Sequence, residues 1–302
     1  MMQFGLACAL LATAFSSAPG SPSAALQDPV SPRAADAKTQ SVYASVVDRK
    51  GEPVTGLTAA DFTVREDGVA REVLRVGPAT ETMQIALLVD DSQASTAAVQ
   101  QIREGLTNFI EALAGKAEIS IVTVGERPTS VVDYTTSAEM LKKGVGRIFA
   151  RQGAGAYLLE ALSEVSRGLE KRGAKRPVIV ALTIEAVEFG SGHYEQILKE
   201  LYASGATLHV LAVGTPAPMS NEEMRNRNMV IAEGTERTGG RRDQLLSSQA
   251  IPDRMKQLAA ELAAQYIVTY SRPDTLIPPE RVRVSVKNPN LIVRATSRAA
   301  GR

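Results

Sequence analysis

An uninterrupted apolar run, Ile85–Val89, ends abruptly at two carboxylates, Asp90 and Asp91. A strand made only of apolar residues is covered on both of its faces, as the strands of a parallel sheet are. In open α/β sheets, ligands bind at the carboxyl ends of the strands. The run therefore predicts a buried parallel strand that carries two acids to the edge of a sheet where ligands bind.

The same pattern recurs along the chain. Three further segments are nearly continuous apolar runs and are predicted strands: Ile119–Val124, Val178–Thr183 and Leu208–Val213. Apolar residues recur at helical spacing between these runs, and glycines end the expected helices. Thr129–Tyr134 is expected to be an antiparallel edge strand, and a last helix precedes Tyr266–Tyr270. This alternation predicts an α/β fold with a doubly wound, mostly parallel sheet over residues 84–270.

The segments on either side of this region alternate apolar and polar residues, as half-buried strands do. Residues 41–77 contain Asp67-Gly68, a strong signal for a tight hairpin turn. Residues 280–296 read as a second hairpin. Because neither segment can bury much surface alone, we expect the two to join in one small all-β module.

The N-terminus has the pattern of a secretory signal peptide. Phe4–Phe15 is an apolar run too short to span a bilayer, and Ser23-Ala24-Ala25 offers a cleavage site. We therefore expect residues 1–25 to be removed and residues 26–40 to form a disordered linker. The protein is then exported to the periplasm, the cell surface or the medium, with no transmembrane segment in the mature chain.

Composition and motifs narrow the possible functions. The net charge is +1, which gives no basis for binding nucleic acid. The sequence contains two histidines and no P-loop, Gly-x-Ser-x-Gly or His-Glu-x-x-His motif. We therefore expect a non-catalytic chain that does not bind nucleic acid.

Several segments, in a specific order, resemble bacterial von Willebrand factor type A-related secreted proteins of the Acidobacteria type. The segments are Val46–Phe62, Gln84–Ser95, Gly155–Leu162, Thr238–Arg241 and Leu262–Tyr270. The resemblance spans about residues 41–296. It implies the Rossmann-like sheet of the type A domain, a metal-ion-dependent adhesion site at the top of that sheet, and a role in binding or adhesion.

In that family, one Asp and two Ser of a first motif hold a divalent metal. The resemblance places Asp90 on the Asp and Ser92 on the first Ser. Ala94 falls on the second Ser, although Ser95 is adjacent. A register that starts instead at Asp91 keeps Ser95 but puts Gln93 on the first Ser.

The family's two remote ligands, a Thr and a later Asp, are also altered. Ala156 falls on the Thr and Ile184 on the Asp, with Glu185 following. Hard oxygen ligands of this kind suit Mg²⁺ or Mn²⁺, and the loss of ligands weakens such a site. The sequence thus predicts a degenerate site in which partial metal ligands and further ligand-binding residues remain. The partial metal ligands are Asp90, Ser92 and Ser95, and the ligand-binding residues are Asp91 and Glu185.

Simpler interpretations stay open for these residues. The two aspartates are also consistent with helix-start acids, worth about 0.3–1 kcal/mol, and Ser95 with a helix N-cap. Glu185 and Glu188 are also consistent with solvated loop acids, and His209 with a packed core residue. The polar segment 216–234 reads as a long loop or short helix over the top of the sheet.

Three functions remain as hypotheses. The first is an exported binding or adhesion module with a degenerate metal site. The second is a metal-independent structural or scaffold protein of the cell envelope. The third is a hydrolase or phosphotransfer enzyme. An acidic pair after a first strand also occurs in phosphoacceptor receiver folds, but those need a further Asp at the end of a later strand, where Thr183-Ile184 stands.

Overall fold

The computed structural model describes residues 38–216, 221–273 and 279–297. The predicted signal peptide and most of the predicted linker lie outside these residues. β1 (Lys38–Val47) begins at Lys38, which pairs with Arg272, so residues 38–40 belong to a strand and not to the linker. In the part of the chain that the structure describes, no helix is both long and apolar enough to cross a membrane.

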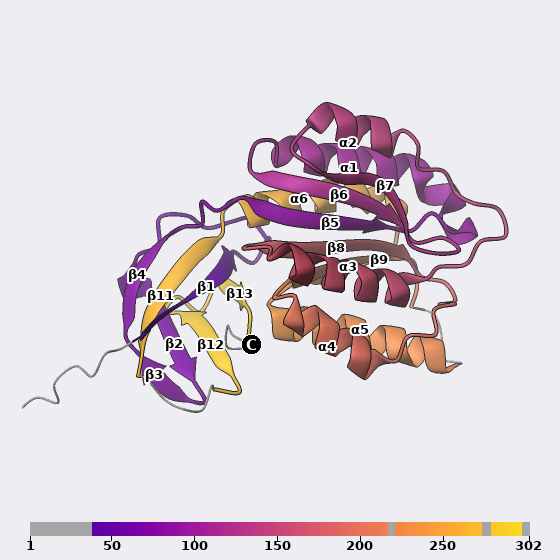
Figure 1. Ribbon diagram of the computed structural model, residues 1–302. Helices are drawn as coiled ribbons and strands as arrows, with labels where there is room; N and C mark the ends of the chain where they lie inside the picture. Colours follow the sequence, from indigo (N-terminus) through magenta and orange to yellow (C-terminus); the bar gives the residue numbers. More distant parts are fainter. Residues whose placement is uncertain (1–37, 217–220, 274–278, 298–302) are drawn as a thin grey trace, which may run out of the picture. The chain divides into compact units, whose positions relative to one another are not determined.

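Six strands form the central sheet, in the order β10-β9-β8-β5-β6-β7 (Figure 1). They are β5 (Met83–Val89), β6 (Ala117–Thr123), β7 (Thr129–Thr135), β8 (Pro177–Ile184), β9 (Thr207–Val213) and β10 (Arg242–Leu245). All neighbouring strands run parallel except β7, which pairs antiparallel with β6 at one edge. The prediction of a doubly wound, mostly parallel sheet with an antiparallel edge strand is confirmed.

Helices cover both faces of this sheet (Figure 1). One face is covered by α1 (Val99–Ala112), α2 (Ala138–Val145) and α6 (Ile251–Ala263). The other is covered by α3 (Leu158–Arg172), α4 (Tyr194–Ala203) and α5 (Glu222–Thr238). Successive residues of a strand point to opposite faces, so Leu87 joins the core that includes α1 and α6, whereas Leu88 joins the core that includes α3 and α4. A continuous apolar run is therefore needed to fill two cores.

Three elements of this domain were not predicted: α2, α5 and β10. α5 has 17 residues and buries Val230 and Ile231, so it is neither a loop nor a short helix. Its apolar pattern is weak because Asn226 and Arg227, although polar, are also buried. Residues 222–234, predicted as a loop or short helix, therefore belong to a long helix of the domain.

The remaining strands form two antiparallel sheets, ordered β13-β1-β11-β4 and β12-β2-β3. They are β2 (Phe62–Glu66), β3 (Val69–Arg71), β4 (Val73–Pro78), β11 (Tyr266–Arg272), β12 (Val282–Val286) and β13 (Ile292–Ala295). Their residues share one core, which includes Val42, Phe62 and Val284. The N- and C-terminal segments thus form one all-β module, as predicted, through the pairs β1–β13 and β2–β12.

Two details of the module differ from expectation. β11 pairs with β1 and β4, whereas residues 266–270 were expected to end the α/β region. β12 and β13 lie in different sheets instead of forming a hairpin, because each finds its partner in an N-terminal strand. The predicted turn at Asp67-Gly68 does join β2 to β3, and both residues have the positive φ, 47° and 85°, that such a two-residue turn requires.

Candidate functional site

The candidate site lies at the carboxyl ends of β5 and β8. After β5, the chain passes through Asp90 and Asp91 into a 3-10 helix, η2 (Gln93–Ala98), which leads into α1. All four acids and hydroxyls of this motif are buried, with 0–3% of their surface exposed. They are Asp90, Asp91, Ser92 and Ser95. The structure therefore brings together the predicted residues of the first motif, but beneath the surface.

Asp90 joins the end of β5 to the end of β8. Its Oδ1 accepts a hydrogen bond from the backbone N–H of Ser92 at 2.9 Å. Its Oδ2 accepts one from the backbone N–H of Ile184 at 2.9 Å and one from the Thr183 hydroxyl at 3.4 Å. Asp90 is thus no exposed helix-start acid, since α1 begins only at Val99. Both of its carboxylate oxygens are engaged by the protein itself.

Asp91 holds two other loops. Its Oδ1 accepts from the backbone N–H of Gly125 at 2.6 Å, and its Oδ2 accepts from Nε of Arg151 at 2.8 Å. An ideal Cβ on residue 125 would lie 2.6 Å from Oδ1, so this close approach requires glycine. Arg151 also lies 3.7 Å from a carboxylate oxygen of Glu126. The charge of Asp91 is therefore balanced within the loops.

The two serines of the motif have different environments. The Ser95 hydroxyl donates to the carbonyl oxygen of Ser92 at 2.8 Å, and Ser95 lies within η2, so it is not the N-cap of α1. The Ser92 hydroxyl is buried and has no hydrogen-bond partner among the described residues. Ser92 is therefore the serine whose oxygen is left without a bond.

Glu185 and Glu188, in the loop after β8, both approach Arg227 of α5. Arg227 Nη1 lies 3.3 Å from Oε2 of Glu185, and its Nε lies 3.9 Å from Oε2 of Glu188. The side chains of all three are at most 4% exposed. Neither glutamate is thus a solvated loop acid.

Glu188 also supports the start of α3. Its Oε1 accepts from the backbone N–H groups of Leu159 and Gly190, at 3.4 and 3.1 Å. Burial raises the pKa of Glu188 to about 7, although Arg227 and the two backbone N–H groups oppose that rise. The Glu188 carboxyl group therefore accepts a hydrogen bond at the N-terminus of α3, which has no side-chain cap of its own.

The residues at this edge do not match the donor set of a divalent-metal site. Ala94, Ala156 and Ile184, which the resemblance places on three ligand positions, offer no side-chain oxygen. Mg²⁺ requires near-octahedral oxygen coordination, but both oxygens of Asp90 already accept hydrogen bonds. Within residues 38–216, 221–273 and 279–297, no cluster of three or more His, Cys, Asp or Glu side chains is placed to hold a metal ion. That Asp90, Ser92 and Ser95 act as partial metal ligands stays a prediction.

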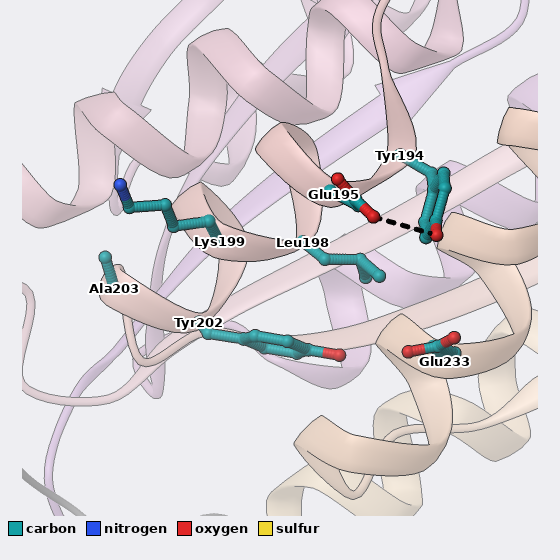
Figure 2. A pocket seen from close by; sticks show the side chains of 7 residues that line it. All are labelled: Tyr194, Glu195, Leu198, Lys199, Tyr202, Ala203 and Glu233. Carbon is teal, nitrogen blue, oxygen red and sulfur yellow. Dashed lines mark hydrogen bonds between the residues drawn. The ribbon is translucent and has the colours of Figure 1, made fainter.

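An open groove of about 570 Å³ lies on α4 and α5, and none of the predicted site residues lines it. Figure 2 shows its lining, with the Tyr194 hydroxyl turned toward the carboxylate of Glu195, to which it donates at 3.1 Å. The remaining lining residues are Leu198, Lys199, Tyr202, Ala203 and Glu233. Charges of both signs line this groove, so it is not a concentrated site for a cation or an anion.

One residue of this edge that sequence reasoning missed is Arg227. A signal for it exists: Arg227 stands three and four positions before Val230 and Ile231, which places it on their face of α5. An arginine on the apolar face of a helix needs a buried anionic partner. The acids Glu185 and Glu188 are those partners, but nothing local connects them to Arg227.

The fold has counterparts among known proteins. The von Willebrand factor type A domain family model matches residues 85–183. A von Willebrand factor type A protein from Catenulispora acidiphila is similar in structure, with 14% identity and a TM-score of 0.51, over 82% of this chain and 73% of that chain. Proximal thread matrix protein 1 from the mussel byssus, with a zinc-occupied MIDAS motif, has 16% identity and a TM-score of 0.50, over 66% and 49% of the two chains.

A search of curated protein sequences found no match. The matched segment begins in β5 and ends in β8, so it contains Asp90 and Asp91 but not the loop after β8. The assignment to the Acidobacteria type stays a prediction. Residues 85–183 therefore match the von Willebrand factor type A domain family, and the chain has a von Willebrand factor type A-like fold.

Proposed function

We propose that this chain is an exported, non-catalytic binding or adhesion module that recognises a protein through the loops at the carboxyl edge of the central sheet. Von Willebrand factor type A domains are protein-interaction and adhesion modules. In this chain the acids of the motif face inward and are neutralised by the protein. The surface available to a partner is therefore formed by the loops that cover these acids.

One observation carries the proposal: an aromatic side chain is held in place while exposed at this edge. Phe189 is 55% exposed and stacks on Tyr157, with ring centroids 6.2 Å apart and planes inclined by 29°. Its backbone N–H donates to the Ala156 carbonyl oxygen at 2.9 Å. An ideal Cβ on Gly155 would lie 2.1 Å from the Phe189 ring, so the ring lies directly against the backbone there.

An aromatic ring fixed in this way loses little conformational entropy on binding, which is why such residues dominate interface energetics. Val187, two residues earlier in the same loop, is 49% exposed. Arg151, on the loop before α3, is 37% exposed although it bonds to Asp91. Exposed apolar groups and a fixed cation on the loops of one edge are typical of a protein interface with a polar rim.

One structurally similar protein binds a metal ion at the corresponding motif. The mussel byssus protein carries zinc at its MIDAS motif. In this chain, three ligand positions of that motif carry apolar side chains. Recognition here is therefore expected to persist when divalent ions are removed, and Mg²⁺ or Mn²⁺ is not required for it.

Site-specific photo-crosslinking tests the proposal. A photoreactive residue replaces Phe189 in the full chain expressed with its signal, and a matched chain carries it at Leu74, an exposed apolar residue of β4. We expect a discrete protein adduct from position 189, in buffer with a chelator, and none from position 74. Phe189→Ser should weaken capture of the same protein, whereas Leu74→Ser should not.

Equal adducts from both positions, or none from either, would contradict the binding proposal and favour the scaffold alternative. Export is tested separately. Intact-mass measurement of the envelope fraction should show a chain that lacks about the first 25 residues, as expected for a cleaved signal. Full-length chain in the cytoplasm would contradict it.

A further inference from the structure

The ends of β5 and β8 concentrate negative charge away from water. Asp90 follows β5, Glu185 and Glu188 lie in the loop after β8, and the side chains of all three are at most 4% exposed. Burying a carboxylate is costly unless it is paired and hydrogen-bonded. Backbone N–H groups donate hydrogen bonds to Asp90 and to one oxygen of Glu188. These dipoles alone do not balance the negative charges of three carboxylates. This edge of the sheet therefore requires a cation.

Arg227 is placed to be that cation. Three of its nitrogens reach three different groups: Nη1 reaches Glu185, Nε reaches Glu188, and Nη2 reaches the Thr183 hydroxyl at 3.4 Å. The same hydroxyl lies 3.4 Å from Oδ2 of Asp90. A guanidinium cannot be deprotonated in a protein, so its charge is permanent. The Thr183 hydroxyl thus lies between this positive charge and Asp90, the acid that the resemblance places on the family's metal-binding Asp.

The helix that carries Arg227 also fixes the acids. One turn earlier on α5, the Met224 sulfur accepts from the backbone N–H of Glu188 at 3.2 Å. The backbone N–H of Glu185 bonds to the Val213 carbonyl at the end of β9, at 2.8 Å. The loop after β8 is thus tied to α5 at two points and to β9 at a third. A metal ion that is bound by several loops would hold them together in the same way.

We propose that Arg227 is a built-in cation that replaces a divalent metal at this edge of the sheet. It holds the loop after β8 against β5 and repels a metal from the position next to Asp90. The inference concerns the chain alone and does not depend on the identity of any partner. It makes Arg227 a positioning residue, because it acts on the binding face through Glu185, Glu188 and Thr183.

If Arg227 replaces a metal, its removal should let a metal bind, which the removal of a merely structural arginine would not do. Without the guanidinium, the buried carboxylates of Glu185 and Glu188 lose their cation, and the Thr183 hydroxyl that it reached lies 3.4 Å from Asp90. Hard oxygen donors of this kind suit Mg²⁺, Mn²⁺ or Ca²⁺. Removal of Arg227 should therefore create a metal dependence that the wild type lacks.

The experiment compares Arg227→Met with Arg241→Met, each of which removes a buried arginine while keeping an apolar stem. Melting temperatures are measured in chelator and in millimolar Mg²⁺, Mn²⁺ or Ca²⁺. We expect no metal effect in the wild type or in Arg241→Met. Arg227→Met should melt lower in chelator and rise by about 3 °C or more with metal, since a ligand of the native state stabilises it.

Two further variants separate charge from packing. Arg227→Lys keeps a cation and should show no metal response, whereas Asp90→Asn added to Arg227→Met should abolish the response. If Arg227→Met does not fold in chelator, metal should restore its circular dichroism spectrum. No restoration, a response no larger than that of Arg241→Met, or an equal response in the wild type would each overturn the proposal.

Discussion

Two arginines of this chain are buried among carboxylates, at opposite ends of the strands of one sheet. Arg227 stands at the carboxyl ends, and Arg241 stands directly before the amino end of β10. Arg241 lies 2.6 Å from Asp243 and 3.3 Å from Glu261 of α6. The other oxygen of Glu261 pairs with Arg294 of β13 at 2.9 Å. This second cluster therefore links the α/β sheet, α6 and the all-β module.

The two clusters use the same chemistry with different partners. The partners of Arg241 lie on regular elements. The acids paired with Arg227 lie in the loop after β8, at 3.3 and 3.9 Å. Charges fixed on helices and strands oppose unfolding, whereas charges fixed on loops decide which loop arrangement persists. Arg241 is thus expected to matter most for stability, and Arg227 for what the site binds.

The largest expected effect is that of Arg241→Met on stability. Breaking a buried ion pair by removing one partner costs about 3–5 kcal/mol, because a charge is left buried and unpaired. Glu261 would keep only Arg294, and the link between α6 and the all-β module would weaken. The free energy of unfolding from urea titration measures this. A larger loss in Arg227→Met than in Arg241→Met would reverse the comparison.

Asp90→Ala tests whether the carboxyl edge is structural throughout. The substitution leaves two backbone N–H groups and the Thr183 hydroxyl without their acceptor, so we expect a loss of about 3 kcal/mol in unfolding free energy. A helix-start acid would cost only about 0.3–1 kcal/mol. Asp90→Asn, which keeps one acceptor, should lie between wild type and Asp90→Ala. A loss below about 1 kcal/mol for Asp90→Ala would show that these bonds contribute little.

The carboxyl-edge cluster should lose stability as pH rises. Because burial raises the pKa of Glu188 to about 7, the native state binds a proton more tightly than the unfolded chain does. The contribution is full below the unfolded pKa of about 4.5 and is lost as pH rises toward 7, by about 3 kcal/mol at most. Glu188→Gln should flatten this part of the stability–pH curve. An unchanged curve would contradict the prediction.

The Arg241 cluster should show the opposite slope because of His209. This histidine is fully buried, and neither ring nitrogen has a hydrogen-bond partner among the described residues. Burial, aided by Arg294 and Arg241, lowers its pKa to about 3. As pH falls, His209 binds a proton near pH 6.5 in the unfolded chain but stays neutral in the native state. The free energy of unfolding therefore falls by about 2 kcal/mol on reaching about pH 5.

His209→Leu removes the proton-binding group and keeps an apolar side chain on β9. We expect its stability to fall less between neutral pH and about pH 5 than that of the wild type. Equilibrium denaturation at the two pH values measures the difference. A parallel decline in the two proteins would mean that His209 is not the source of the acid sensitivity.

The fold could be predicted because its signals are local. Continuous apolar runs such as Ile85–Val89 identify strands covered on both faces, and Asp67-Gly68 identifies a hairpin turn. α5 could not be predicted in the same way, since Asn226 and Arg227 interrupt its apolar face and are buried only by the rest of the domain. The assignment of 266–270 to the wrong sheet has a similar cause: alternation indicates a strand but not its neighbour.

The sequence by itself determined the class of fold, the edge of the sheet where a site is expected, and the absence of a side-chain oxygen at positions 94, 156 and 184. These follow from periodicity and residue type. Only the tertiary structure decided that Glu185 is a buried ion-pair partner, because Arg227 lies 42 positions away in the chain. Burial and charge balance arise when helices pack on a sheet, so no local pattern contains them.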